Sequence, residues 1–170
     1  MAQKAKLHRV SKRRRKENKT DYKKRFNLLK SGKPRMVFRK TNSQVIAQYV
    51  TSNEAQDKVE FGIDSKDLIS YGWPENARGS LKSMPASYLV GYFAGKKILN
   101  KDLEKPIVDF GMSHMIYKSR NFGFLKGLVD AGIEIGCRED PFPEDSRIKG
   151  EHLKNDIPLE EIKSKLENAK

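Results

Sequence analysis

The stretch KTDYKKRFNLLKSGKPRMVFRKTNSQVIAQ, residues 19–48, contains a helix signal followed directly by a strand signal. Thr20 is a residue type that caps helices at their first turn, and an acidic Asp21 suits the positive end of the helix dipole. Gly32 and Pro34 are residue types that end helices. The sequence therefore predicts a short helix between these positions, followed by a strand where the chain resumes.

The apolar residues of the expected helix share one face. Tyr22, Phe26 and Leu29 are spaced i, i+4 and i+7, whereas the lysines between them lie on other faces. We expect the apolar stripe to dock on a hydrophobic core and the lysines to face solvent.

Three strands are expected to follow in an antiparallel meander. In the first, Met36 and Phe38 lie on one face, and Arg35 and Arg39 lie on the other. A turn at 41–43 and a polar loop at 52–57 separate runs that are rich in β-branched residues or alternate apolar and polar residues. The predicted strands are residues 35–40, 44–51 and 58–63.

The second half of the chain alternates helix and strand signals. Trp73 follows a short helix and is interpreted as a packing anchor rather than a base-stacking residue. In the next helix, small residues such as Gly91 and Gly95 are expected to let it lie close to the sheet. A strand–helix–strand order implies parallel pairing with right-handed crossovers. The predicted elements are helices 66–71, 85–100 and 120–131 and strands 106–111 and 133–137.

The expected fold class is therefore α/β, with a mixed sheet of about five strands, packed helices and a ribonuclease H-like topology. Residues 1–19 are expected to form a disordered basic arm, because their few apolar residues cannot form a core. Residues 20–137 form the α/β domain. Residues 138–170 are expected to be an extended segment that ends in a short helix at 158–168, with Leu159, Ile162 and Leu166 on one face.

The positive charge of the chain is concentrated at its beginning. Residues 1–40 contain 17 Lys and Arg against 2 Asp and Glu, so their net charge is +15, and the remaining residues carry −2 of the total of +13. Such asymmetry points to nucleic acid or an anionic membrane surface as the partner. The run KRRRK at 12–16 also matches a nuclear-import or heparin-binding patch, but the charge continues into the expected helix and strand, which favours nucleic acid.

The composition argues against secretion and membrane insertion. A single cysteine, Cys137, allows no intrachain disulfide and fits a reducing, intracellular compartment. No apolar stretch follows the basic N-terminus, so it does not read as a secretory signal. The longest apolar window, at 88–94, is far shorter than the ~20 residues of a membrane span. We expect a soluble protein without a membrane partner.

Residue types that support catalysis are scattered. His8, His114 and His152 lie far apart along the chain, Cys137 has no positioned base, and neither common glycine-rich phosphate loop occurs. A two-metal nuclease on the expected scaffold needs clustered carboxylates, and the corresponding elements supply only Asp109. We expect no enzyme activity, metal, cofactor or small-molecule substrate.

What remains is a binding surface for RNA. Arg and Lys neutralise phosphates, amide side chains both donate and accept hydrogen bonds, and tyrosines stack on bases. These types gather on the first strand and the turn after it, near the start of the helix at 120, and in the C-terminal segment. The candidates are Arg35, Arg39, Asn42, Gln44 and Gln48, then Tyr117, Lys118 and Arg120, and then Arg147 and Lys149.

Five segments in order resemble one family. They are KTDYKKRFNLLKSGKPRMVFRKTNSQVIAQ, PASYLVGYFAGKKIL, VDFGM, KSRNFGFLKGLVDAGIEI and FPEDSRIKGEHL. Together they look like the archaeal form of the 5S rRNA-binding protein of the large ribosomal subunit, the L-eighteen family, whose eukaryotic member is called L-five. The resemblance covers roughly residues 10–153.

The resemblance implies a non-catalytic protein of the cytoplasmic ribosome. Its place would be the central protuberance, in contact with 5S rRNA, 23S rRNA and neighbouring ribosomal proteins. The family's RNA-binding stretches map onto 12–16, 19–25, 33–48, 118–120 and 147–149. They add the candidates Lys12, Arg13, Arg14, Arg15, Lys16, Lys19, Tyr22, Lys24, Arg25, Lys33 and Lys40.

Two other functions stay open at this stage. One is a ribonuclease H-like nuclease, which the missing carboxylates disfavour. The other is a non-specific basic protein of chromatin or membrane surfaces, which would bind any polyanion equally through residues 1–19.

Overall fold

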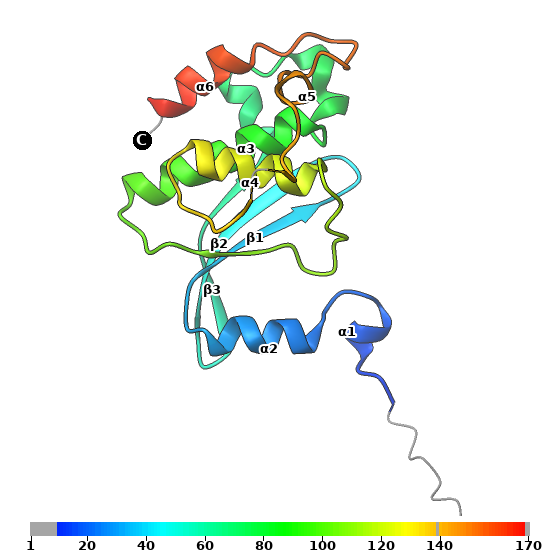
Figure 1. Ribbon diagram of the computed structural model, residues 1–170, viewed down its shortest axis with the longest axis vertical. Coiled ribbons are helices and arrows are strands. Elements are labelled where there is room, and N and C mark those ends of the chain that lie inside the picture. Colours follow the sequence, from blue (N-terminus) through cyan, green and yellow to red (C-terminus); the bar gives the residue numbers. More distant parts are fainter. Residues whose placement is uncertain (1–9, 139, 169–170) are drawn as a thin grey trace, which may run out of the picture.

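The computed structural model describes residues 10–138 and 140–168 as an α/β fold around a four-stranded sheet (Figure 1). The strand order is β3-β2-β1-β4. The first three strands pair antiparallel, and β4 pairs parallel with β1. The strands are β1 (Arg35–Lys40), β2 (Val45–Asn53), β3 (Gln56–Asp64) and β4 (Ile107–Asp109).

The predicted meander is confirmed, but its second connection is shorter than expected. Strands β2 and β3 continue to a two-residue turn in which Glu54 and Ala55 have φ values of 48° and 66°. Positive φ at both central residues is the geometry that matches the twist of a tight hairpin. The polar loop predicted at 52–57 is therefore wrong. Met36 and Phe38 point into the core as predicted, with 0% and 1% exposure.

Two helices, α3 (Met84–Asn100) and α4 (Arg120–Asp130), pack closely against each other and against the sheet. A Cβ at Gly91 would lie 2.2 Å from the Phe124 carbonyl oxygen, and one at Gly127 would lie 2.2 Å from that of Tyr88. Both helices were predicted. However, Gly91 approaches α4 rather than the sheet, which corrects the predicted role of its small residues.

A fifth strand at 133–137 was predicted, and this prediction is wrong for the described structure. The Ile133 amide donates to the Leu128 carbonyl, which closes the end of α4, and the Cys137 amide donates to the nearby Ile135 carbonyl. In a β-strand, the amides of Ile133 and Cys137 would point in the same direction, toward one neighbouring strand. Because both are used locally, the segment adds no ladder beside β4. The ribonuclease H-like topology stays a prediction.

Two 3₁₀ helices, η1 (Ser65–Tyr71) and η2 (Glu75–Ser80), connect the sheet to α3. The first was predicted as a short helix at 66–71, and its N-cap is Asp64. Trp73 between them is buried, and its indole Nε1 donates to the Ala77 carbonyl at 3.0 Å. Trp73 is therefore a packing anchor, as predicted.

The C-terminal segment is partly helical. The predicted terminal helix is confirmed as α6 (Leu159–Glu167), which buries Ile162 and Leu166 completely and accepts a hydrogen bond from the Tyr92 hydroxyl at Glu167. The predicted extended path before it is interrupted by the short helix α5 (Asp145–Lys149). None of the helices in the described ranges combines the length and hydropathy that crossing a bilayer requires.

The N-terminal elements lie at one end of the sheet (Figure 1). They are the single turn α1 (Arg13–Lys16) and α2 (Tyr22–Lys30). The disorder predicted for residues 1–19 is wrong for the α1 turn, while residues 1–9 lie outside the described structure. The predicted docking of the apolar stripe of α2 is also wrong, because Phe26 is 66% exposed and no residue of α2 is buried. The face of β1 opposite Met36 and Phe38 carries Arg35 and Arg39, which line one cavity with Leu28 of α2, so α2 meets charged side chains there and not the core.

Candidate nucleic-acid interface

The start of α2 is fixed by Asp21. Its Oδ1 accepts the amides of Lys23 at 3.0 Å and Lys24 at 3.2 Å, and the hydrogen bond from Lys24 is the main reason why the pKa of Asp21 is lowered. Thr20, the predicted cap, has another partner: its Oγ1 accepts from Arg14 Nε at 2.9 Å. This bond ties α1 to the beginning of α2.

Three further contacts hold α1 and its N-cap Lys12 against the start of α2 and against the chain after β4. Lys12 Nζ lies 4.5 Å from the centre of the Tyr22 ring, a cation–π distance. Arg15 lies 3.8 Å from Asp21 and 3.7 Å from the Met112 sulfur. Residues 12–16, which were predicted to belong to a disordered arm, therefore lie beside the sheet, and their charges add to those of α2.

Arg35 has a structural environment. Its side chain is 3% exposed, and its Nη2 donates to Asp57 Oδ1 at 2.6 Å and to Ser52 Oγ at 3.0 Å. Arg25 pairs with the other Asp57 oxygen at 2.9 Å. Burial raises the pKa of Asp57, but hydrogen bonds from Ser52 and both arginines outweigh burial and lower it. In this conformation Arg35 is not open to a phosphate.

Arg39, in contrast, is 44% exposed while its guanidinium is held in place. Nη1 donates to the Asp109 carbonyl at 2.7 Å, and Nη2 donates to Asp109 Oδ2 at 3.1 Å. Gly111, at φ +60°, leaves room for it: a Cβ there would lie 2.9 Å from the guanidinium carbon. Burial raises the pKa of Asp109, and the Gly111 amide and Arg39 lower it further than burial raises it. Arg39 is thus a positioned cation.

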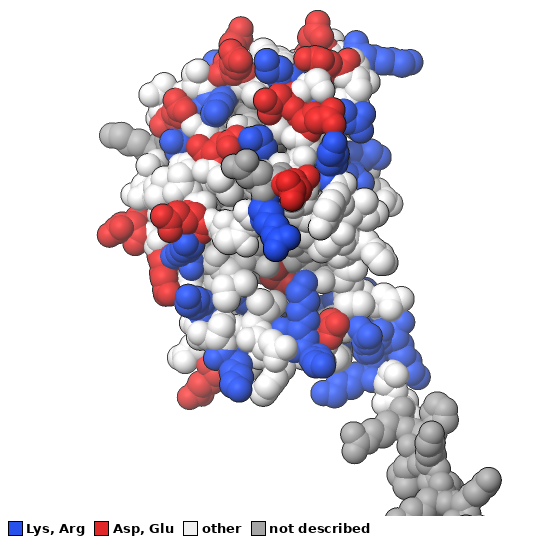
Figure 2. Space-filling model, viewed as in Figure 1, with Lys and Arg blue, Asp and Glu red and all other residues white. Residues whose placement is uncertain are grey.

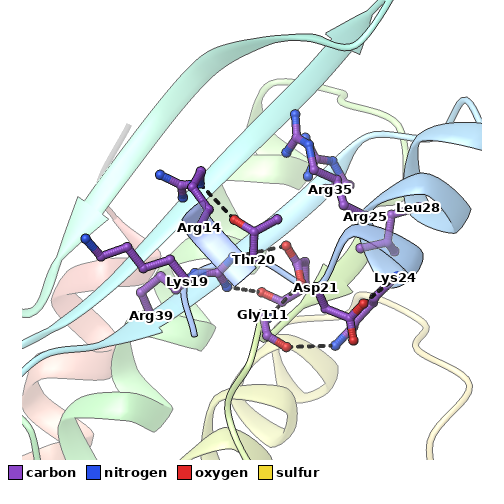
Figure 3. Close-up of a pocket in the computed structure, with 11 residues that line it drawn as sticks. Arg14, Lys19, Thr20, Asp21, Lys24, Arg25, Leu28, Arg35, Arg39 and Gly111 are labelled. Atoms are coloured by element: carbon purple, nitrogen blue, oxygen red, sulfur yellow. Dashed lines mark hydrogen bonds and ion pairs between the residues drawn. The ribbon is translucent and has the colours of Figure 1, made fainter. Parts of the chain in front are cut away.

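Arg39, Arg14, Lys19 and Arg25 surround a small cavity of about 140 Å³ between α1, α2 and the ends of β1 and β4 (Figure 3). In Figure 3 Lys24 closes one side, where its Nζ donates to the Gly111 carbonyl at 3.3 Å. The cavity is lined almost entirely by charged and polar groups.

Cations outnumber acids over these elements. Within the described ranges, eight basic residues between 12 and 40 form no salt bridge within 4.0 Å: Lys12, Arg14, Lys16, Lys23, Lys24, Lys30, Lys33 and Lys40. Figure 2 shows basic side chains along the lower part of this face, around α1 and α2, and acidic ones mixed among them higher up. The candidates named from the sequence did not include Lys30, or Lys23 individually, although Lys23 lies in the stretch 19–25. Their position on the solvent side of a basic helix was the available signal.

The predicted amide residues differ in availability. Asn42 is exposed in the turn between β1 and β2. Gln44 Nε2 donates to Asp64 Oδ2 at 3.3 Å, and Gln48 is half-buried on β2. Asn42 is therefore the most accessible of the three.

The two basic groups predicted further along the chain partly converge. Lys118, Arg120 and Arg147 line one cavity of about 490 Å³ beside the start of α4, whereas Lys149 is exposed outside it. Lys118 pairs with Glu144 at 2.6 Å, and Arg120 donates to the Lys82 carbonyl. Tyr117 is 69% exposed next to this cavity's lining.

This second basic group adjoins the first. Burial and the charge of Arg120 both lower the pKa of Lys40 at the end of β1. The basic surface therefore continues from α2 across β1 to the start of α4.

No described group of three His, Cys, Asp or Glu residues is arranged to hold a metal ion. Asp109 contributes a single carboxylate, and it is engaged with Arg39. The described part of this surface therefore presents mainly cations, and Asp109, its buried carboxylate, is paired with one of them.

Sequence comparisons agree with a ribosomal role. The family model described as ribosomal large subunit proteins 60S L5 and 50S L18 matches residues 6–108. The chain belongs to this family. It is therefore a structural ribosomal protein rather than an enzyme, and the nuclease alternative is removed.

Three archaeal relatives carry the name large ribosomal subunit protein uL18. The protein of Korarchaeum cryptofilum is 40% identical over 86% of this chain and 73% of its own length. That of Thermofilum pendens is 39% identical over 87% of this chain and 74% of its own. That of Methanoculleus marisnigri is 42% identical over 86% and 81%. The similarity thus extends beyond the region of the family match.

Proposed function

We propose that this ribosomal protein binds 5S rRNA and helps to attach it to 23S rRNA in the central protuberance of the large subunit. Family membership supports a place in the large subunit of the cytoplasmic ribosome. The observation that carries the RNA contact is the surface of α1, α2 and β1, where eight basic residues have no described acidic partner. Unneutralised cations on a rigid surface are what a phosphate backbone binds.

The binding has two components. Exposed cations such as Lys16, Lys23 and Lys30 attract RNA at long range and release its counterions. Arg39, fixed by Asp109, and Asn42 at the turn then supply positioned groups that read shape. Arg35 acts indirectly, because it holds the β2–β3 hairpin and α2 together through Asp57.

The cavity formed by Lys118, Arg120 and Arg147 is a second contact region. Because it adjoins the first region through Lys40, one RNA can cover both, or two RNA segments can meet there. Tyr117, exposed beside it, offers a face for stacking or for a neighbouring ribosomal protein. We assign 23S rRNA and protein neighbours to this side.

The test is binding of the full chain to 5S rRNA and to an unrelated folded RNA of equal length, across a salt series. The variant changes Lys16, Lys23 and Lys30 to Gln, which removes three exposed charges that make no described side-chain contact. The matched control changes Lys66, Lys154 and Lys165 to Gln, which removes the same charge from exposed positions elsewhere.

We expect the full chain to prefer 5S rRNA, the variant to bind more weakly, and the control to bind as the original does. Equal binding to both RNAs would favour the non-specific polyanion binder. Equal weakening by both triple variants would mean that net charge matters and the location of the basic surface does not. The second region is tested with a 23S rRNA fragment added to the complex of protein and 5S rRNA. The proposal is supported if the fragment binds the complex of the original chain and does not bind the complex of a variant that lacks the charges of Lys118, Arg120 and Arg147.

A further inference from the structure

Phe26, in the middle of α2, has a ring that is largely uncovered. The residue is 66% exposed. Within the described ranges, neither a second aromatic ring nor a cation lies against it. Tyr22, the other aromatic residue of α2, differs, because Lys12 Nζ lies over its ring at 4.5 Å. Phe26 is therefore the aromatic residue of α2 whose ring is open to a partner.

Positive charge surrounds this ring. Lys23 and Lys30 precede and follow Phe26 by about one helical turn, so they share its side of the helix. Both lysines are exposed, and neither forms a salt bridge in the described ranges. The helix itself contains no acidic residue. A single exposed apolar side chain is common on protein surfaces. Here, however, the charges around the ring require that whatever covers it be anionic.

The backbone that carries the ring is fixed. Asp21 caps the helix by accepting two backbone amides of its first turn. Arg25, directly before Phe26, pairs with Asp57 of β3 at 2.9 Å and so ties the helix to the β2–β3 hairpin. Only the side-chain torsions of Phe26 are left to be ordered when a partner covers the ring, so the entropic cost of binding there is small.

A partner that combines negative charge with flat apolar faces is single-stranded RNA. Proteins that bind single strands combine cationic grooves with aromatic side chains on which bases stack. We propose that one unpaired base of the bound RNA stacks on Phe26, while the phosphates beside that base contact Lys23 and Lys30. The proposal rests on the function proposed above. It adds a residue that was not among the candidates named from the sequence, because Phe26 was expected to face the core.

The first test measures binding of the full chain and of three variants to 5S rRNA across a salt series. Phe26→Leu keeps an apolar side chain and removes the ring, and Phe26→Trp keeps an aromatic ring. Leu99→Ala is the control, because it removes exposed apolar surface from the end of α3 that lies against Gly132. We expect Phe26→Leu to weaken binding about fivefold to fiftyfold, as the loss of one stacked base allows. Phe26→Trp should restore the binding that Phe26→Leu loses, and Leu99→Ala should bind as the original chain does.

The salt series separates stacking from charge. Stacking releases no counterions, so the slope of log K against log salt should be the same for Phe26→Leu and for the original chain. A smaller slope for Phe26→Leu would mean that the residue acts only by placing the neighbouring lysines, and it would overturn the proposal.

The second test detects the stacked base directly. The indole introduced by Phe26→Trp takes an exposed position, whereas Trp73, the only tryptophan of the original chain, is 2% exposed. A base that stacks on an indole quenches its fluorescence. We expect 5S rRNA and single-stranded oligoadenylate to quench the fluorescence of Phe26→Trp and not that of the original chain. Inorganic polyphosphate, which carries charge without bases, should leave it unchanged. Quenching by polyphosphate, or no quenching by either RNA, would contradict the stacking.

The outcomes separate this proposal from the proposed function. If the original chain does not prefer 5S rRNA, the proposed function fails, and quenching by oligoadenylate still tests the stacking of a base on this ring. If the preference stands and Phe26→Leu binds as tightly as the original chain, the stacking proposal is wrong. In that case, loss of Phe26→Ala from assembled large subunits would show that a neighbouring protein covers the ring. Equal melting temperatures of the variants, expected for an exposed residue, exclude unfolding as the cause of weaker binding.

Discussion

At the residue scale, one carboxylate decides whether the N-terminal elements stay in place. Asp57 stands at the start of β3 and pairs with two arginines: Arg35 of β1, which is 3% exposed, and Arg25 of α2. Removing one partner of a buried pair leaves the other charge uncompensated. Arg35, which was predicted as an RNA contact, is therefore first of all a structural residue. Its partner Asp57 could not be identified from the sequence, because it lies 22 residues away along the chain.

We predict that Asp57→Asn lowers the free energy of unfolding by about 2–3 kcal/mol at neutral pH, below the full value for a buried pair because Asp57 is partly exposed. The folded pKa of Asp57 lies below 3.8, so its contribution is present above that pH and is lost as pH falls through the folded pKa. Denaturant titrations at several pH values measure this. The difference between the two chains should shrink in acid.

Asp156→Asn is the control, because Asp156 is exposed and forms no described salt bridge. It should leave stability unchanged at every pH. A difference between Asp57→Asn and the original chain that persists undiminished at low pH would contradict the charge-based explanation.

At the element scale, the pairing of α3 with α4 depends on glycine. The sequence showed glycines in both helices and suggested packing, but which surface they approach follows only from the fold. At Gly127 a Cβ would meet backbone atoms of Tyr88 and Tyr92 at 2.2 and 2.8 Å. Backbone cannot move aside as a flexible side chain can, so the helices would have to separate.

We predict that Gly127→Ala destabilises the protein by about 3 kcal/mol, which is the upper end of overpacking costs, despite the better helix propensity of alanine. Thermal unfolding followed by circular dichroism measures the effect. Gly79→Ala is the control, because nothing lies within 4 Å of a Cβ there. If both variants melt at the same temperature, the close approach of α3 and α4 does not depend on the lack of a side chain at Gly127.

At the scale of the whole molecule, charge is separated from the core. Residues 10–40, the described part of the basic first quarter, form α1 and α2 at one end of the sheet and the strand β1, and residues 41–170 are nearly balanced in charge. Association with RNA should therefore be strongly salt-dependent and should be controlled by this end. A positive charge spread over the whole molecule would also make RNA binding salt-dependent. The location of the charges separates the two cases, because only in the localised case should charges at this end control the salt dependence.

We predict that the variant with Gln at positions 16, 23 and 30 reduces the slope of log K against log salt by about 2 to 3, since each lost phosphate contact removes roughly 0.7 to 0.9. Filter binding to 5S rRNA from low to moderate salt measures the slope. The control with Gln at positions 66, 154 and 165 should retain the original slope. A parallel reduction in both would mean that the contacts are not localised.

By itself the sequence determined the local elements and the charge separation. The meander, α3, α4 and α6 follow from periodicity and from capping residues, and these are signals between near neighbours in the chain. The basic first quarter and the ordered motifs likewise indicated the ribosomal family, and the family match bears this out.

Only the tertiary structure decided the features that depend on distant residues. The buried state of Arg35 depends on Asp57, the role of Gly91 depends on Phe124, and the loss of the fifth strand depends on where the amides of Ile133 and Cys137 find acceptors. The same holds for Phe26, which is exposed because α2 meets the charged face of β1 and not the core. Burial and hydrogen-bond satisfaction are properties of the packed chain, because each depends on groups that the sequence does not place side by side.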